Sequence, residues 1–397
     1  MTLRRMVLIV ATELVAGGAI APAPAQSPAA VAELVAAARA SHSDALYLWR
    51  DGAVLIDTTF SADPTPIELM SAFKSVVALG IGRLLEQGKL ASLDTPVHTF
   101  YPEWNQGRKK AITVRHLLNH TSGLQNVGNA GIEIYPAPNA IQLALAAELT
   151  ADPGTEFSYN NKAVNLLAGI IERASGLRMD LFFQDQFFGP LGIEEYQWYF
   201  DRSGSPHAMA GLRLKAADVA KFGLLVLDRG RWKGQQLIGE SFLAEMTRPS
   251  QPHYPLVGLL WWIEPDTQQV TLRTESIRTR PRGSLFHRLA PLAGQTFPTR
   301  PAARAAALAT VGQTDDSLFV REAGPRWVDS VFAWRVGAPL AYHANGYLGQ
   351  YLVVVPAARL VAVRQIRNSD GYDPKTDGFE DFPARVARMA RAGGAIK

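Results

Sequence analysis

The sequence predicts an α/β protein, of the α+β type, built on one antiparallel sheet whose strands come from both ends of the chain. Residues Ala45–Phe60 form two strand-like runs around Asp51-Gly52, a residue pair that favours a tight hairpin turn. Near the other end, Tyr351–Gln365 has the same form around Pro356-Ala357-Ala358. Two hairpins so far apart in the chain indicate that both ends contribute to a single sheet.

Helical patterns follow the first hairpin and close the chain. Apolar residues recur with helical spacing over Ala72–Gln87, where Gly88 ends the pattern, and again over Phe382–Ala392. The helix-rich middle predicts helices on the sheet faces and an inserted, mainly helical region at about residues 95–250. A second insertion, at about residues 264–327, is rich in Pro, Thr, Ala and Arg. Its arginines indicate a solvated face, and the alternatives are a lid or a contact with an anionic group.

Composition narrows the functional classes. The chain has 397 residues, of which 47% are hydrophobic and 19% charged, as in a compact globular protein. A net charge of +4 is too small to imply nucleic acid as the main partner. The chain has no cysteine, which excludes disulfides, a thiol nucleophile and thiolate metal sites.

The N-terminus has the layout of a secretory signal peptide. Arg4 and Arg5 precede an apolar run, and Ala23-Pro24-Ala25 is a small-residue cleavage site, so we predict cleavage after Ala25. Because Glu13 interrupts the short apolar run, an uncleaved anchor is the weaker interpretation. Residues 1–25 would be the signal peptide and residues 26–397 one periplasmic or secreted domain. No later run reaches about 18 apolar residues, so we expect no stable membrane span after processing.

A serine and a lysine lie three residues apart in the segment Ser71-Ala72-Phe73-Lys74, at the start of the first long helix. Residues at positions i and i+3 share a helix face, so the hydroxyl and the amine would be neighbours. A serine becomes nucleophilic when a base takes its proton, and a desolvated lysine can be that base. The plain alternative is Ser71 as a helix cap and Lys74 as a surface charge.

Further landmarks follow in a fixed order. They are the string HLLNHTSGL ending at Leu124, the triplet Tyr159-Asn160-Asn161, the string LRLKAADVAKFGLL ending at Leu225, and the strand-forming segment Tyr342–Pro356. The chain resembles the serine hydrolases related to class C β-lactamases and D-alanyl-D-alanine carboxypeptidases, including esterase and 6-aminohexanoate-dimer-hydrolase-like members. Those families carry Ser-x-x-Lys, Tyr-x-Asn, and Lys-Thr-Gly or His-x-Gly in this order.

The resemblance implies a role for each matching residue. Ser71 would attack a carbonyl and hold the acyl group, with Lys74 and Tyr159 as general base and acid; which of the two is the base stays open. Asn161 would bind Lys74 and the substrate's acyl side chain. The N–H of Ser71 and one N–H of the strand His343–Gly346 would form the oxyanion hole. The family uses no metal or organic cofactor, and we expect none here.

The third landmark departs from the Lys-Thr-Gly form. Its best match is His343-Ala344-Asn345-Gly346, although an ungapped alignment to Pro356 slides the match by two residues. A permanent cation at this position would bind the carboxylate of a β-lactam or a peptide, whereas a histidine is mostly neutral at pH 7. The resemblance implies a substrate-binding or oxyanion role for His343, Asn345 and Gly346. The missing cation favours neutral ester or amide substrates.

Three functional hypotheses remain. The first is an exported serine hydrolase acting on a small ester, amide or peptide-like molecule through an acyl-enzyme. The second is a β-lactamase or D,D-peptidase with the same machinery, and the third is a non-catalytic binder of the same fold. A zinc pair at His116 and His120 is disfavoured because Leu117 occupies the position of the metalloprotease glutamate. The sequence leaves the oligomeric state open.

Overall fold

A six-stranded antiparallel sheet is the centre of the fold, with strands in the order β2-β1-β14-β13-β12-β8. The computed structural model describes residues 28–324 and 327–392, so the predicted signal peptide lies outside the described residues. The strands are β1 (Ala45–Arg50), β2 (Ala53–Thr59), β8 (Trp262–Pro265), β12 (Pro339–Gly346), β13 (Gln350–Val355) and β14 (Leu360–Gln365). N-terminal β1 pairs directly with C-terminal β14, which confirms the predicted fold class.

The first hairpin has the turn that its sequence predicts. Asp51 and Gly52 join β1 to β2 and have φ angles of 45° and 94°. Positive φ at both positions is the geometry of the turn that matches the twist of paired strands, and glycine adopts it without strain.

Helices cover both faces of the sheet. Helices α1 (Pro28–Ala40) and α16 (Phe382–Ala392) pack on one face, here called the terminal-helix face, against residues such as Leu48 and Val353. The opposite face, here called the site face, packs against α2 (Phe73–Glu86) and α9 (Ala216–Leu227). Because both faces are covered, every residue of β13 and β14 is buried.

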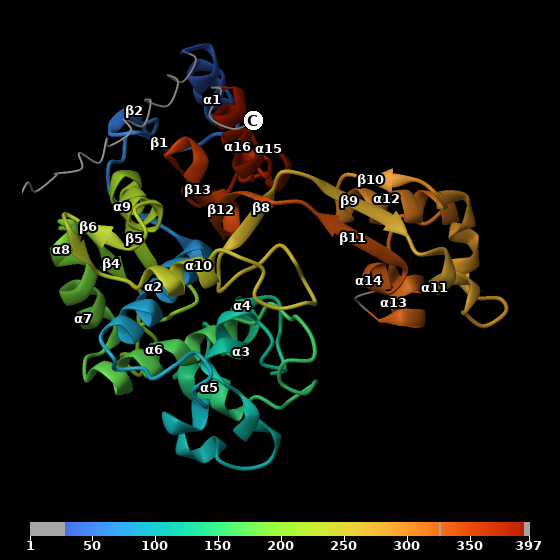
Figure 1. The fold of residues 1–397 in the computed structure, drawn as a ribbon, viewed down its shortest axis with the longest axis horizontal. Coiled ribbons are helices and arrows are strands. Elements are labelled where there is room, and N and C mark those ends of the chain that lie inside the picture. Colours follow the sequence, from blue (N-terminus) through green and yellow to red (C-terminus); the bar gives the residue numbers. More distant parts are fainter. Residues whose placement is uncertain (1–27, 325–326, 393–397) are drawn as a thin grey trace, which may run out of the picture.

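The helical region packs below the site face (Figure 1). Its helices are α3 (Val114–Leu118), α4 (Ala130–Glu133), α5 (Ala140–Ala146), α6 (Asn161–Ser175), α7 (Met179–Phe183), α8 (Gly189–Leu191) and α10 (Glu240–Met246). Short strands accompany them: β3 (Ile67–Glu68), β5 (Leu212–Leu214) and β4 (Gln197–Trp198) form one sheet, and β6 (Arg231–Trp232) and β7 (Gln235–Gln236) another. A short α15 (Pro374–Asp377) precedes α16. Within the described ranges, no helix is long and apolar enough to cross a bilayer.

The predicted Arg-rich insertion is a folded lobe that projects from the β8 and β12 edge of the sheet (Figure 1). Residues 268–336, here called the lobe, contain in their described part the sheet β10-β9-β11, four α-helices and the 3₁₀ helix Leu285–Leu292. The elements are β9 (Gln268–Leu272), α11 (Thr274–Arg278), β10 (Thr296–Phe297), α12 (Arg300–Val311), α13 (Ser317–Ala323), α14 (Trp327–Val331) and β11 (Phe332–Val336). The lobe has its own core, in which Phe286, Phe319 and Trp327 pack together.

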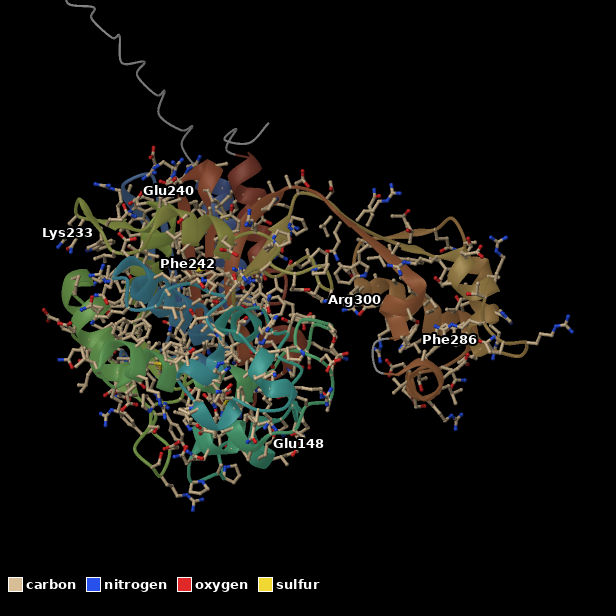
Figure 2. The ribbon with its side chains drawn as sticks, turned by 60° about the horizontal axis from the view of Figure 1, so that its bottom comes forward. Glu148, Lys233, Glu240, Phe242, Phe286 and Arg300 are labelled. Atoms are coloured by element: carbon tan, nitrogen blue, oxygen red, sulfur yellow. The ribbon has the colours of Figure 1, made fainter. Side chains whose placement is uncertain are left out.

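Most lobe arginines are solvated, as the charge run predicts. Arg273, Arg278, Arg282, Arg288 and Arg304 are exposed. Arg280 and Arg300 are half-buried instead: Arg280 lies over the Phe286 ring, and Arg300 lies where the lobe approaches the main body (Figure 2).

Candidate active site

Ser71 lies in a short 3₁₀ turn (Met70–Ala72) between strand β3 and helix α2. Met70, directly before it, has a φ of 48°, a backbone conformation that is strained for a residue other than glycine. The Lys74 ammonium donates hydrogen bonds to Ser71 Oγ at 2.8 Å and to the carbonyl of Met209 at 2.7 Å. The i, i+3 spacing therefore brings the hydroxyl and the amine together.

The surroundings of Lys74 favour its neutral form. Only 3% of the residue is exposed, and this burial lowers the pKa of the Lys74 amine because a charged group is costly where water is excluded. The Tyr159 phenol acts in the opposite direction, through its charge and a hydrogen bond to the amine, and raises the pKa of Lys74. Burial is the larger effect, so the amine of Lys74 can lose its proton more readily than a surface lysine.

Tyr159 closes the site from the loop that precedes α6. Its ring centre lies 5.1 Å from Lys74 Nζ. The ring packs against His120 at a centroid distance of 4.6 Å and stacks on Trp262 at 6.3 Å. The Asn126 side chain donates to the Tyr159 carbonyl at 3.0 Å. The Tyr159 ring is thus held from two sides over the amine.

His120 connects the string HLLNHTSGL to this loop. Its Nδ1 accepts the backbone N–H of Asn160 at 3.2 Å, and its carbonyl accepts the N–H of Ser158 at 2.8 Å. Burial lowers the pKa of His120 to about 3, so the ring is neutral. His116 instead accepts the N–H of Thr113. Among the residues the structure describes, no cluster of His, Asp or Glu side chains suits a metal ion.

Asn161 is the first residue of α6 and is buried, and its side-chain oxygen has no hydrogen-bond partner among the described residues. The resemblance places Asn161 against Lys74, whereas the carbonyl of Met209 accepts the second hydrogen bond of the amine. Asn165, one turn further along α6, fixes that carbonyl by accepting the N–H groups of Ala208 and Met209 at 3.0 and 3.1 Å. The roles of Met209 and Asn165 were not predicted, because a backbone acceptor has no residue signature.

The end of strand β12 approaches the Ser71 turn at Gly346. A Cβ atom at Gly346 would lie 2.4 Å from the Leu69 carbonyl oxygen and 2.9 Å from the Ala72 nitrogen. Only a residue without a side chain allows this approach. The structure therefore brings Gly346 to the candidate site, beside the backbone of Ser71.

The structure turns the side chains of His343 and Asn345 away from the site, so a side-chain role for these two residues in substrate binding is not supported. The oxyanion role expected of a backbone N–H in His343–Gly346 stays a prediction. His343 pairs with Val353 and Asn345 with Tyr351, and both partners belong to the core under the terminal helices. Directly opposite residues on paired strands share a face, so both side chains point away from Ser71. The ring of His343 is buried there, and burial lowers its pKa to about 3.

A cavity of about 560 Å³ lies between the main body and the lobe, next to Tyr159. Its walls come from residues 156–159, from Tyr254, and from Arg300 and Asp329 of the lobe. The site thus consists of a half-buried serine and a buried lysine, with a phenol over the amine and a cavity on the phenol side.

Comparisons with known proteins place this chain in a family. A sequence model of the Beta-lactamase family matches residues 29–377, so the chain belongs to that family, whose members are serine hydrolases. Esterase EstB of Burkholderia gladioli is 30% identical over 152 residues. The matched stretch covers 34% of this chain and only 38% of that esterase.

Solved structures confirm the fold. A Bacillus anthracis protein provisionally named a 6-aminohexanoate-dimer hydrolase is 18% identical, with a TM-score of 0.62 over 88% of this chain and 79% of that chain. A class C beta-lactamase mutant is 14% identical, with a TM-score of 0.58 over 92% of this chain and 96% of that chain.

Proposed function

We propose that the protein is an exported serine hydrolase that cleaves ester or amide bonds through a covalent acyl-enzyme on Ser71. The observation that carries this proposal is the 2.8 Å contact between Lys74 Nζ and Ser71 Oγ in surroundings that lower the pKa of the amine. A neutral amine at that distance can accept the hydroxyl proton, and Tyr159 is close enough to take part in the transfer.

The reaction has two halves. Ser71 Oγ bonds to the substrate carbonyl carbon while its proton passes to the Lys74–Tyr159 pair. The resulting oxyanion would be stabilised by the N–H of Ser71 and an N–H at the end of β12, where Gly346 allows the close approach. The bond to the leaving group then breaks, and the leaving alcohol or amine takes the proton from Tyr159. Water cleaves the acyl-enzyme by the same steps in reverse order.

The substrates that fit this site best are neutral around the scissile bond. The residues of β12 on the site face near its end are Tyr342, Ala344 and Gly346, none of which carries a cation. A β-lactam or a D-alanyl peptide needs a partner for its carboxylate. This supports a small ester or amide over the β-lactamase and D,D-peptidase alternatives. The free oxygen of Asn161 is suited to accept an N–H of the acyl side chain.

The N-terminal pattern supports the proposed export, with a periplasmic or secreted protein as the expected location. Expression of the full chain followed by cell fractionation and intact-mass measurement tests this part. A mature protein that begins after Ala25 and leaves the cytoplasm supports export, whereas a full-length cytoplasmic protein contradicts it.

The chemistry is tested by intact-mass measurement of wild type and Ser71→Ala after exposure to a short ester, a β-lactam and a phosphonate probe. We expect a phosphonate adduct on wild type and none on Ser71→Ala, with turnover of the ester and not of the β-lactam. Turnover of the β-lactam would favour the alternative activity. If no probe labels wild type, the acyl-enzyme proposal fails and a binding role becomes the better account.

A further inference from the structure

The cavity beside Tyr159 has aromatic walls on the main-body side. Phe157, Tyr159 and Tyr254 line it, and the rings of Phe157 and Tyr254 stack on each other at 4.8 Å. Tyr254 also meets Trp262 at 6.1 Å and Trp334 of the lobe at 5.3 Å, both edge to face. Together with the stacking of Trp262 on Tyr159, these contacts form a continuous row of rings from the candidate site to the lobe.

Arg300 fixes the lobe side of the cavity. Its guanidinium forms an ion pair with Asp329 and lies 4.7 Å from the centre of the Trp334 ring and 5.7 Å from that of Tyr254. Its Nε is buried. Because Arg300 belongs to the lobe and Tyr254 to the main body, their contact connects the two parts. The charge of Arg300 is matched by Asp329, and its planar face is covered by the two rings. Arg300 is not presented as a free cation to a ligand.

The position of the cavity relative to the chemistry decides which part of a substrate enters it. In the proposed reaction Tyr159 gives its proton to the leaving group, and Tyr159 also lines the cavity. A leaving group that extends past Tyr159 would therefore enter the space between the main body and the lobe. A volume of about 560 Å³ is ample for a one- or two-ring group.

We infer that this cavity is a leaving-group subsite for a neutral aryl group, built jointly by Phe157, Tyr159 and Tyr254 with the lobe. The inference rests on the proposed function and specifies its substrate class: esters or amides of aryl-bearing alcohols or amines. Aromatic side chains bind another ring in offset-stacked or edge-to-face contacts beyond the effect of apolar burial. Because Asp329 is paired with Arg300, the unmatched carboxylate of the lining is that of Glu156, which disfavours an anionic leaving group.

Benzyl butyrate and cyclohexylmethyl butyrate test the inference, because their alcohols have similar acidity and differ mainly in aromaticity. We expect wild type to favour the benzyl ester by roughly fivefold in kcat/KM. Tyr254→Leu should bring this ratio to about one, and Phe157→Leu offers the same test if Tyr254→Leu fails to fold. The matched control is Phe297→Leu, a half-buried lobe aromatic outside the cavity, which should keep the wild-type ratio.

Three results would overturn the inference. They are a wild-type ratio near one, a ratio unchanged by both cavity variants, and a stronger preference for the cationic ester butyrylcholine than for the benzyl ester. Saturation-transfer NMR with benzyl alcohol and cyclohexylmethanol separates this inference from the proposed function, since it needs no turnover. If Ser71→Ala binds benzyl alcohol preferentially and Tyr254→Leu does not, the aryl site stands even where wild type cleaves no ester. If the esters are cleaved without such binding, the hydrolase proposal stands and the aryl site fails.

Discussion

Gly346→Ala is the substitution that tests the site geometry most directly. The added Cβ would lie 2.4 Å from the Leu69 carbonyl oxygen and 2.9 Å from the Ala72 nitrogen. Heavy atoms that are not bonded to each other pack best at about 3.5 Å. The end of β12 and the Ser71 turn must therefore move apart by about 1 Å. Both neighbours are backbone atoms, which cannot rotate away as a side chain can. A misplacement of about 1 Å at a reacting group costs roughly 100-fold in rate, and local overpacking costs about 2 kcal/mol of stability.

The assay is kcat/KM for a p-nitrophenyl ester, measured together with the free energy of unfolding in urea. Gly128→Ala is the matched control, because a Cβ at Gly128 meets nothing within 4 Å and the residue has no positive φ. We expect the control to keep activity and stability near wild type. If Gly346→Ala retains activity within about threefold of wild type while it remains folded, the close approach of β12 does not position the reaction.

Three further outcomes are expected. Burial lowers the pKa of Lys74, so between that pKa and the ordinary lysine pKa the unfolded chain binds more protons than the folded one, and the free energy of unfolding rises with pH. Lys74→Met should remove this pH dependence and leave the free energy of unfolding at pH 7 no lower than in wild type. The same variant should reduce kcat by roughly 1000-fold, because the base is lost. Arg364→Met should lower the free energy of unfolding, measured in urea, by about 4 kcal/mol, because the buried guanidinium donates hydrogen bonds to five groups. The control Arg108→Met removes only an exposed ion pair and should lower it by less than about 1 kcal/mol. His120→Phe leaves the N–H of Asn160 without its acceptor and should lower the free energy of unfolding by about 2 kcal/mol. In wild type, kcat between pH 5 and 8 should show no step from His120, because burial lowers the pKa of this residue to about 3.

Local rules explain what could be predicted from the sequence. The Asp51-Gly52 turn depends on two backbone angles that few residue pairs adopt, so its residues identify it. The proximity of Ser71 and Lys74 follows from helix geometry alone. The predicted helix Ala72–Gln87 is α2 with one residue fewer at each end, because the segment before it winds as a 3₁₀ turn.

The remaining features depend on contacts that residue types do not encode. Neighbouring residues of a strand point to opposite faces of the sheet. Without the usual lysine, the motif can be aligned one residue out of register, which assigns a residue of the opposite face to the site, as with His343. The acceptor at Met209 is a backbone carbonyl, which every residue has. The core of the lobe consists of apolar residues from short elements, and arginines separate these residues in the sequence. The sequence pattern therefore predicts a solvated segment and does not predict a core.

In the proposed function, different parts of the fold carry the chemistry and the substrate selection. β8 continues into β9 and β11 returns into β12, and each outgoing strand pairs with its returning partner, so the lobe is carried on a two-stranded extension of the central sheet. Ser71, Lys74 and Tyr159 lie outside the lobe, whereas Arg300 and Trp334 belong to it. A change in the lobe can therefore reshape the cavity without moving the serine–lysine pair, which is held by α2 and by the carbonyl of Met209. Substitutions at the contact of Arg300 with Trp334 should accordingly alter which leaving groups are accepted before they alter the rate of the chemical step.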